Sequence, residues 1–536
     1  QTRALRSGGV SGGRSGLLER LALLSEGRAI PVAALAALVA GLATMTPDLI
    51  GVFFDDAIYA LLGRSIAEGN GYVYGHLPGT PPAIHYPPLF PALLALVWRI
   101  EPAMPAAVIP LKLVNPVMLA LAAAGATRVM HHLFGFREAT SLALALLGFV
   151  GIPTLVLANV LLSEPMFLAL LFPMLLSAAR ATETGDVRDA AVAGLWSGAL
   201  LLTRTVGGVF VVSAGLVFLT QRRWRSLALY SAVVLSCALP WQMFVWRHAT
   251  DFPDLLRGSY GPYLEWMVGG YREGGVGLLH SVLAKNFSDA LRSLGAMLTP
   301  GLPGAPRLAA SLIAVLALAF GLCAALRQRR TRAPALGVAV YLVVVFAWPF
   351  QIERFLWGLW PLLVALAAFG VRASMQWLEA RQWFPLRAVV LGSAMSLAAG
   401  HLLYNVRGIK RGWASSASRQ MSSRAEPVVR YLNADPRLDG KVVASEADPV
   451  VALYTGLRVV PLEVLEPRDH IKPKDVESRA AGIAAFDAAY RPDAFVLMAD
   501  GVHVPALLRA PLDTGRLLVD ISPPGLPVRA FLVTQP

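Results

Sequence analysis

The sequence predicts an α-helical polytopic membrane protein that carries a small α/β domain near its C-terminal end. Of the 536 residues, 56% are hydrophobic and only 15% are charged. The mean hydropathy of +0.57 lies above the range of soluble globular domains. Apolar windows of about 20 residues, the length that crosses a bilayer as a helix, recur over the first three quarters of the chain. The composition therefore excludes an ordinary soluble enzyme.

We expect about eleven membrane spans. The runs between residues 139 and 220 are short and nearly continuous, so the count is least certain there. The expected spans cover residues 30–47, 109–130, 139–158, 163–180, 189–203, 205–220, 226–246, 304–326, 334–350, 355–371 and 387–405.

The arginine residues indicate the orientation of these spans. The net charge is +13, but the basic residues form short clusters at alternate span ends instead of one basic face. Nucleic-acid binding is therefore excluded, and the clusters are expected in the cytoplasm. The opposite face then receives a loop over 48–108, a second loop over 247–303, and the tail after Asn405.

Composition changes along the chain predict four parts. Residues 1–29 read as a flexible basic cytoplasmic tail, 30–405 as the transmembrane domain, 406–419 as a linker, and 420–536 as an extracytoplasmic α/β domain. The last part alternates short β-rich runs with helical stretches. Its β-rich runs are 441–444, 457–460, 494–497 and 531–533, and its helical stretches are 427–433 and 480–489.

An acidic pair, Asp55-Asp56, follows the first expected span directly. The residues after it are apolar at helical spacing, which predicts a short surface helix capped by Asp55 or Asp56. A second surface helix is expected after His85-Tyr86-Pro87-Pro88. Two adjacent carboxylates at a membrane boundary are costly to desolvate, so their position also favours chemistry at the membrane surface.

Three further charged residues are expected at the same outer level: Glu164, Arg204 and Arg354. Each of these residues also has a purely structural interpretation. Ser163 can cap the helix that starts at Glu164, and arginine often anchors a span at the interface. Together, acids and arginines from four loops on one face predict a cavity. In it, guanidinium groups would hold phosphate while a carboxylate acts as a base.

The order of these motifs resembles the GT-C glycosyltransferases, in the branch of the protein O-mannosyltransferases and the lipid A aminoarabinose transferase. The resemblance implies a polyprenyl-phosphate-sugar donor and a catalytic carboxylate at Asp55. Asp56 stands where the family more often has Glu, and its expected role is that of a second catalytic acid or of the helix cap. Tyr86 stands where the family has Lys before Pro-Pro-Leu, so His85 and Tyr86 can offer the donor phosphate only a hydrogen bond.

The predicted function is inverting transfer of a sugar to an acceptor hydroxyl on the extracytoplasmic face, in the bacterial inner membrane. Asp55 is the expected general base, Arg204 and Arg354 the phosphate ligands, and Glu164 a supporting acid. The acceptor would be a lipid, a glycan or a protein. No nucleotide is needed. No cofactor is expected either, although the acidic pair with Glu164 could hold a divalent cation.

Two other classes of function stay open at this point. A lipid transporter or flippase also has many spans, but the sequence shows neither related halves nor charges at mid-bilayer depth. A non-catalytic GT-C-like subunit of a membrane complex is favoured mildly by the missing lysine near Pro87-Pro88. The aromatic residues of 247–303 suggest a loop that folds over the cavity, or an interfacial aromatic belt. Cys237 and Cys323 lie in apolar runs, which excludes a disulfide framework.

Overall fold

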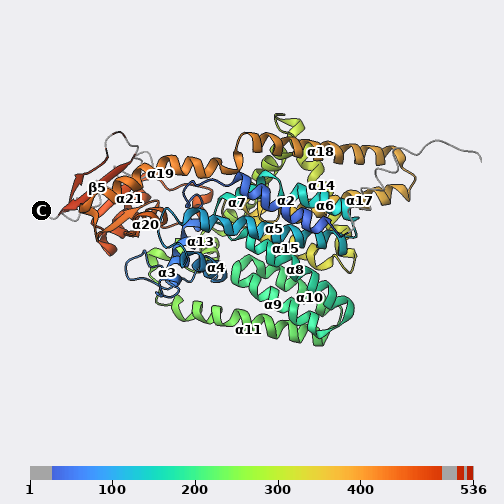
Figure 1. Cartoon of the computed structure of the whole chain (residues 1–536), viewed down its shortest axis with the longest axis horizontal. Coiled ribbons are helices and arrows are strands. Elements are labelled where there is room, and N and C mark those ends of the chain that lie inside the picture. Colours follow the sequence, from blue (N-terminus) through green and yellow to red (C-terminus); the bar gives the residue numbers. More distant parts are fainter. Residues whose placement is uncertain (1–26, 498–515, 524, 526–527, 535–536) are drawn as a thin grey trace, which may run out of the picture.

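The computed structural model describes residues 27–497, 516–523, 525 and 528–534, so nearly all of the expected basic tail lies outside the described residues. A large bundle of helices is joined by a long helix to a smaller domain containing a β-sheet (Figure 1). The fold class predicted from the sequence is confirmed: this is a helical integral membrane protein with a small C-terminal α/β domain.

Each expected span overlaps one helix or two consecutive helices, but the count of about eleven spans is not confirmed. By length and composition, six described helices can cross a membrane, or seven if the bent pair α6 (Glu138–Phe149) and α7 (Ile152–Asn159), which turn by 54°, form one span. The six are α5 (Val108–His132), α8 (Glu164–Thr184), α11 (Trp224–Ala249), α14 (Ala305–Arg327), α17 (Trp360–Glu379) and α18 (Phe384–Lys410).

Four expected windows form shorter helices of 13–17 residues. At 1.5 Å per residue they extend about 20–25 Å, less than a hydrocarbon core of about 30 Å. They are α2 (Ala29–Thr44), α9 (Val187–Thr203), α10 (Gly208–Thr220, preceded by η1, Thr205–Gly207) and α15 (Arg332–Phe346).

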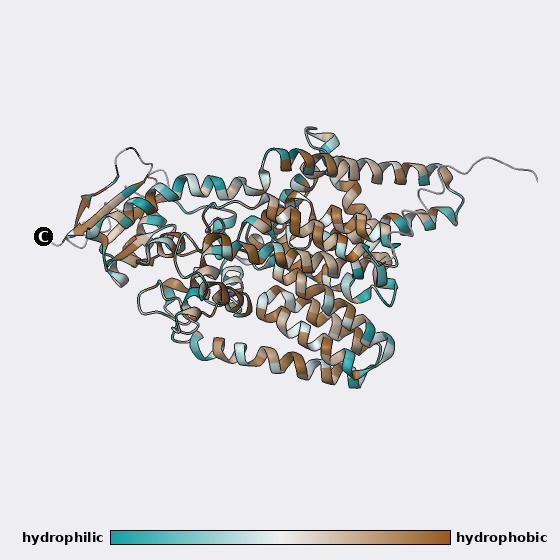
Figure 2. Ribbon diagram, viewed as in Figure 1, coloured by the Kyte–Doolittle hydropathy of each residue, from teal (hydrophilic) through white to brown (hydrophobic). Residues whose placement is uncertain are grey.

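Small residues let α14 and α17 approach each other closely. A Cβ atom added to Gly321 of α14 would lie 2.0 Å from the carbonyl oxygen of Leu366, and one added to Gly370 of α17 would lie 2.0 Å from that of Ala317. Such contacts are typical of helices that pack within a bilayer. The outer helices α11 and α18 instead leave most of their apolar windows exposed, as expected for surfaces that face lipid (Figure 2).

The two expected surface helices are present as α3 (Asp55–Ala67) and α4 (Leu89–Trp98), which pack against each other. The expected capping of α3 by Asp55 or Asp56 is wrong, because the cap position is Phe54 and no side chain caps the helix. Both carboxylates lie in the first helical turn. They are therefore free to bond elsewhere.

The segment over 247–303 is mostly helical, which corrects the loop expected there. It contains η2 (Asp254–Leu256), α12 (Arg257–Tyr260) and the 36-residue α13 (Tyr263–Leu298), kinked at Gly275. The glycines between 269 and 277 weaken the local helical preference. Packing of α13 against α14 and α18 overrides that preference.

The C-terminal domain contains a five-stranded sheet with strand order β2-β1-β3-β5-β4. β1, β2 and β3 are parallel, and β5 pairs antiparallel with both β3 and β4. All four β-rich runs and both helical stretches are confirmed, whereas β4 was not predicted. The elements are η3 (Trp413–Ser415), α19 (Ser416–Ala434), η4 (Pro436–Leu438), β1 (Val442–Ser445), α20 (Asp448–Thr455), β2 (Arg458–Val460), η5 (Pro467–His470), α21 (Val476–Tyr490), β3 (Ala494–Leu497), β4 (Leu517–Asp520) and β5 (Arg529–Thr534).

This domain packs directly on the segment that leads into α3. The backbone N–H of Ile50 donates to the Tyr454 hydroxyl at 2.6 Å, and that of Leu49 donates to Ser422. Val450 lies so close to Gly51 that a Cβ atom there would be 2.4 Å from a Val450 methyl carbon. The C-terminal domain therefore helps to position the start of α3.

Candidate active site

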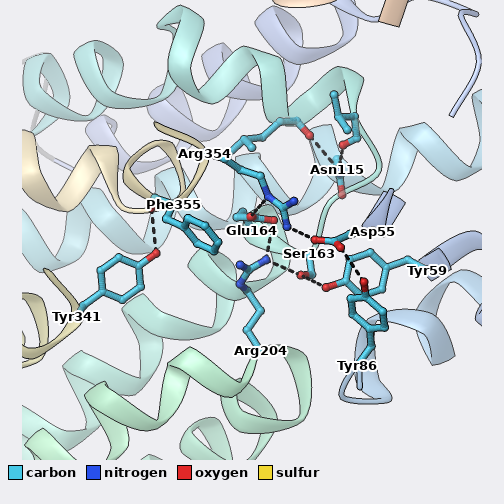
Figure 3. Close-up of polar contacts among 12 residues, drawn as sticks. Asp55, Tyr59, Tyr86, Asn115, Ser163, Glu164, Arg204, Tyr341, Arg354 and Phe355 are labelled. Carbon is cyan, nitrogen blue, oxygen red and sulfur yellow. Dashed lines mark hydrogen bonds and ion pairs between the residues drawn. The ribbon is translucent and has the colours of Figure 1, made fainter. Parts of the chain in front are cut away.

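Charged side chains from four elements meet in one cluster (Figure 3). Asp55 is the first residue of α3, Glu164 is the first residue of α8, and Arg204 follows the last residue of α9. Arg354 comes from the short helix α16 (Ile352–Trp357), just before α17. The four residues that the sequence predicted to converge therefore do so.

Glu164 is the centre of the cluster. Arg204 Nη1 lies 2.8 Å from its Oε2 atom, and Arg354 Nε donates to its Oε1 atom at 3.2 Å. The Glu164 side chain is only 2% exposed. A carboxylate buried to that degree needs paired charges, and here it holds two guanidinium groups side by side.

Asp55 is the most accessible member of the cluster, with 18% of its side chain exposed. Arg354 binds its Oδ2 atom, and the Tyr86 hydroxyl donates to its Oδ1 atom at 2.7 Å. Burial alone would raise the pKa of Asp55. The charge of Arg354 and the hydrogen bond from Tyr86 outweigh that effect and hold the pKa below its usual value. Asp55 is therefore ionised in this arrangement.

Asp56 points away from the two arginines. It is fully buried and accepts hydrogen bonds from the backbone N–H groups of Gly51, Val52 and Phe53, at 2.7, 3.0 and 2.9 Å. Burial raises the pKa of Asp56, and these amides oppose the rise. The two members of the acidic pair thus differ: Asp55 faces the charged cluster, and Asp56 ties down the loop before α3.

The backbone between these contacts is strained. Phe54 has φ 64° and ψ −59°, and the N–H of Asp55 donates to the carbonyl of Phe53 at 2.6 Å. This is a γ-turn with positive φ, a rare conformation for a residue with a side chain. Strain of this kind persists only where surrounding contacts impose it. The Asp56 contacts do so here, and they aim Asp55 at the cluster.

His85 and Tyr86 do not contact the arginine side chains. Tyr86 bonds Asp55, while His85 Nδ1 bonds the carbonyl of Gly261 and its ring packs 3.6 Å from that of Tyr263. Burial lowers the pKa of His85 to about 4, with the Gly261 carbonyl and Asp55 opposing the shift. His85 is therefore neutral near pH 7.

Two further residues, Ser163 and Tyr59, join the cluster. Ser163 stands at the cap position of α8, but its hydroxyl makes no capping hydrogen bond. Instead it accepts from Arg204 Nη1 at 2.9 Å and bonds the Tyr59 hydroxyl at 3.0 Å. Tyr59 lies one helical turn after Asp55, a spacing that places both on one face of α3. In the sequence, that spacing is the only feature that could have placed Tyr59 at the site.

Arg354 is held from behind by aromatic residues. The Tyr341 hydroxyl donates to the carbonyl of Phe355 at 2.9 Å, which ties α16 to α15. The Arg354 guanidinium lies 5.6 Å from the ring centre of Phe53 and 5.7 Å from that of Phe355. Aromatic rings at such distances attract a cation. They therefore help to position Arg354 in addition to its carboxylate partners.

A metal-binding cluster is not seen at this site. Within the described parts of the chain, no group of three or more His, Cys, Asp or Glu side chains gathers as a metal centre requires. The positive charge beside Asp55 comes instead from Arg204 and Arg354. Such a pair can bind phosphate oxygens through several charge-assisted hydrogen bonds.

Comparisons with known proteins give similarity at the level of structure only. No protein-family model and no curated protein matches the sequence. The structure is similar to the crystal structure of ArnT from Cupriavidus metallidurans bound to undecaprenyl phosphate, with 14% identity and a TM-score of 0.47, covering 97% of this chain and 98% of that one. It is also similar to the apo form of that ArnT, with 15% identity, a TM-score of 0.47 and coverage of 94% and 97%.

Proposed function

We propose that this protein is a membrane glycosyltransferase of the GT-C type that uses a polyprenyl-phosphate-linked sugar. The observation that carries the proposal is the shared binding of Arg354 by Asp55 and Glu164, with Arg204 on the other side of Glu164. The ionised carboxylate of Asp55 thus binds one guanidinium group directly, and Glu164 joins that group to the second one. A base beside a phosphate site is what this transfer requires.

The resting cluster is balanced in charge, with Asp55 and Glu164 against Arg204 and Arg354. A donor phosphate adds negative charge, so its binding requires a guanidinium group to exchange a carboxylate for phosphate oxygens. Arg354 is the better placed to exchange, because it is shared between two carboxylates. When Arg354 turns to the phosphate, burial dominates at Asp55 and its pKa rises. Donor binding thereby makes Asp55 a stronger base.

The chemical step is a single displacement with inversion at the anomeric carbon. The acceptor oxygen bonds to that carbon as its proton passes to Asp55. The bond from carbon to phosphate oxygen breaks, and the polyprenyl phosphate departs with its charge held by Arg204 and Arg354. Glu164 keeps the two guanidinium groups in place. The acceptor is a hydroxyl of a lipid, a glycan or a protein.

We also propose that the site faces the extracytoplasmic side of the bacterial inner membrane. The ends of α5, α8 and α14 opposite the site carry Arg128, Arg180 and Arg327, and basic residues collect on the cytoplasmic side of membrane proteins. A tag fused to the C-terminus should be cleaved by protease added outside right-side-out vesicles. Cleavage only after the vesicles are opened would reverse the orientation.

The transfer assay uses the purified protein in vesicles, with a polyprenyl phosphate carrying a radiolabelled sugar and membrane extract as acceptor. Asp55→Asn should bind the donor and fail to transfer the sugar. Arg204→Ala should weaken both donor binding and rate. Glu68→Gln, an exposed carboxylate at the end of α3 that pairs with Arg64, is the control and should behave as wild type.

The same assay separates the competing classes of function. A lipid transporter would move the labelled donor across the bilayer intact, and a non-catalytic subunit would leave it unchanged. Retained turnover in Asp55→Asn would remove Asp55 as the base. Unchanged donor affinity in Arg204→Ala would remove the phosphate role of that residue.

We infer that the transfer needs no metal ion, because Arg204 and Arg354 supply the positive charge that a divalent cation would bring to the leaving phosphate. The rate should be unchanged after treatment with EDTA and gel filtration. Loss of the rate with EDTA, and its recovery with added Mg²⁺ or Zn²⁺, would contradict this inference.

A further inference from the structure

A basic cavity lies at the end of the bundle opposite the charged cluster. Its volume is about 430 Å³, and an adjoining cavity of about 180 Å³ extends it. Arg180 follows Glu164 by 16 positions on α8, which corresponds to about 24 Å along the helix axis. The larger part is lined by Arg128, His132, Pro173, Leu176, Ser177 and Arg180. The smaller part adds Glu183 and Arg330. We call both parts together the basic cavity.

Positive side chains from three elements converge on the basic cavity. Arg128 comes from α5, Arg180 from α8, and Arg330 from the turn between α14 and α15. All three, together with His131, lie near enough to His132 to interact with it electrostatically. The acid in the lining, Glu183, is paired with Arg330 at 2.6 Å.

Two of these arginines lack a counter-ion. Neither Arg128 nor Arg180 forms an ion pair with any residue that the structure describes, and both are exposed. A lone arginine at the end of a span usually extends to water as an anchor. Here Arg128 and Arg180 line the same hollow from two different helices. That geometry suits an anion that can bind both.

The rest of the lining is apolar and reaches into the bundle. On α8, Arg180 lies near the end of the helix, whereas Leu176 and Pro173 lie one and two turns further in. The wall therefore changes from charged to apolar over about 10 Å. Ser177 offers little competing polarity, because its hydroxyl donates to the carbonyl of Pro173 at 2.8 Å. A ligand that fills this cavity needs a charged head and an apolar tail.

We propose that the basic cavity binds an acidic phospholipid, with its phosphate between Arg128 and Arg180 and an acyl chain against Leu176 and Pro173. Such a lipid supplies the missing counter-ion and reaches the site within the plane of the membrane. Free phosphate would match the arginines but leave the apolar wall uncovered. The proposal does not rest on the proposed transferase function, since the two sites are at opposite ends of α8.

Lipid binding should be measured on the whole purified protein in phosphatidylcholine nanodiscs. Native mass spectrometry counts retained phosphatidylglycerol, and the thermal unfolding midpoint is followed as phosphatidylglycerol is added. The wild type should retain phosphatidylglycerol and unfold at a higher temperature with it. Arg128→Gln/Arg180→Gln should bind it roughly thirtyfold more weakly, the expectation for two lost charges near an anionic lipid surface.

A matched control removes two charges from the same face outside the cavity. Arg222 lies in the turn between α10 and α11, and Arg225 lies in the first turn of α11, so Arg222→Gln/Arg225→Gln should bind phosphatidylglycerol as wild type does. Arg128→Lys/Arg180→Lys keeps the charge and should retain most of the binding.

Several outcomes would overturn the proposal. Equal losses in the two glutamine pairs would mean that surface charge alone attracts the lipid. Equal stabilisation by added phosphatidylcholine would remove the specificity for acidic lipid. Full stabilisation by inorganic phosphate would show that the apolar wall plays no part. Unfolding of the Arg128→Gln/Arg180→Gln variant at the wild-type temperature without phosphatidylglycerol establishes that the variant is folded.

Discussion

The Tyr86 hydroxyl donates to one carboxylate oxygen of Asp55 at 2.7 Å, while Arg354 binds the other oxygen. The two partners differ in kind. Arg354 can be drawn away by an incoming phosphate, but Tyr86 has no charge that a phosphate would attract. Tyr86 can therefore keep Asp55 oriented while the charge beside it changes. A tyrosine in place of the lysine that the resemblance implies is therefore compatible with the proposed transfer.

Replacing Tyr86 by Phe removes a hydrogen bond that lowers the pKa of Asp55. The pKa should then rise, so that Asp55 is protonated over a wider acidic range and the acidic limb of the kcat/KM profile moves to higher pH. The rate on that limb should fall by about tenfold, since a hydrogen bond to a charged group is worth about 1.5 kcal/mol. Tyr72→Phe is the control, because the Tyr72 hydroxyl bonds the Tyr86 carbonyl and not Asp55. An unmoved acidic limb in Tyr86→Phe would count against Asp55 as the titrating base.

Replacing Glu164 by Gln removes the carboxylate that lies between Arg204 and Arg354, and leaves Asp55 as an ion-pair partner of Arg354 only. Breaking a buried ion pair in this way should cost about 3 kcal/mol of stability. The thermal unfolding midpoint in detergent should therefore fall. Glu353→Gln is a near neighbour whose carboxylate accepts from Ser293 at 3.1 Å, and it should lower the midpoint far less. Equal midpoints for the two variants would show that Glu164 does not hold the arginines together.

The convergence of Asp55, Glu164, Arg204 and Arg354 could be predicted from the sequence, because all four lie at span ends that the basic clusters place on one side of the membrane. Position at a membrane boundary restricts a residue to a thin layer. Four charged residues in one such layer have few other charged groups to pair with, so they pair with one another.

The different roles of Asp55 and Asp56 could not be predicted. Adjacent residues on a helix point about 100° apart, and the sequence does not say which of the two faces the arginines. The answer depends on the strained turn at Phe54, which directly follows the backbone that Asp56 binds. The contacts of the C-terminal domain with the rest of the chain could not be predicted either, because they join distant residues: Tyr260 bonds Asp448 across 188 positions of sequence.

Asp448 makes the stability of the C-terminal domain contact depend on pH. Tyr260 bonds both Asp448 and, at 3.1 Å, His76 Nε2, so three segments that lie far apart in the sequence meet in one buried chain of hydrogen bonds. Burial raises the pKa of Asp448 to about 8, with the Tyr260 hydrogen bond opposing the shift, and burial lowers the pKa of His76 to about 3. A carboxyl whose folded pKa is raised binds a proton that the unfolded chain has released. Its contribution to stability is therefore fully present below about pH 4 and is lost as the pH rises towards 8.

Asp448→Asn removes this titration. The thermal midpoint of the variant should fall less than that of the wild type between pH 5 and pH 8, as measured by unfolding in detergent across that range. Asp439→Asn, in the turn before β1, is the control and should follow the wild-type profile. Parallel profiles for wild type and Asp448→Asn would mean that Asp448 is ionised in the folded protein.

Gly51 links the C-terminal domain to the loop before α3, so Gly51→Ala should lower both stability and the rate of the proposed transfer. Its φ of 121° is unfavourable for alanine, and the new Cβ atom would be 2.4 Å from Val450 Cγ2, a branched side chain with little freedom to move. Strain of this kind costs about 2 kcal/mol. The N–H of Gly51 also donates to Asp56, so a shift at Gly51 moves the turn that aims Asp55. The transfer rate should therefore fall by more than the loss of folded protein alone would explain.

Adding Val450→Ala relieves the contact but not the backbone strain, so it should restore only part of the rate. Gly75→Ala is the control, because no atom lies within 4 Å of the new Cβ, and it should change neither the rate nor the thermal midpoint. A normal rate in Gly51→Ala would show that the contact with the domain does not position Asp55.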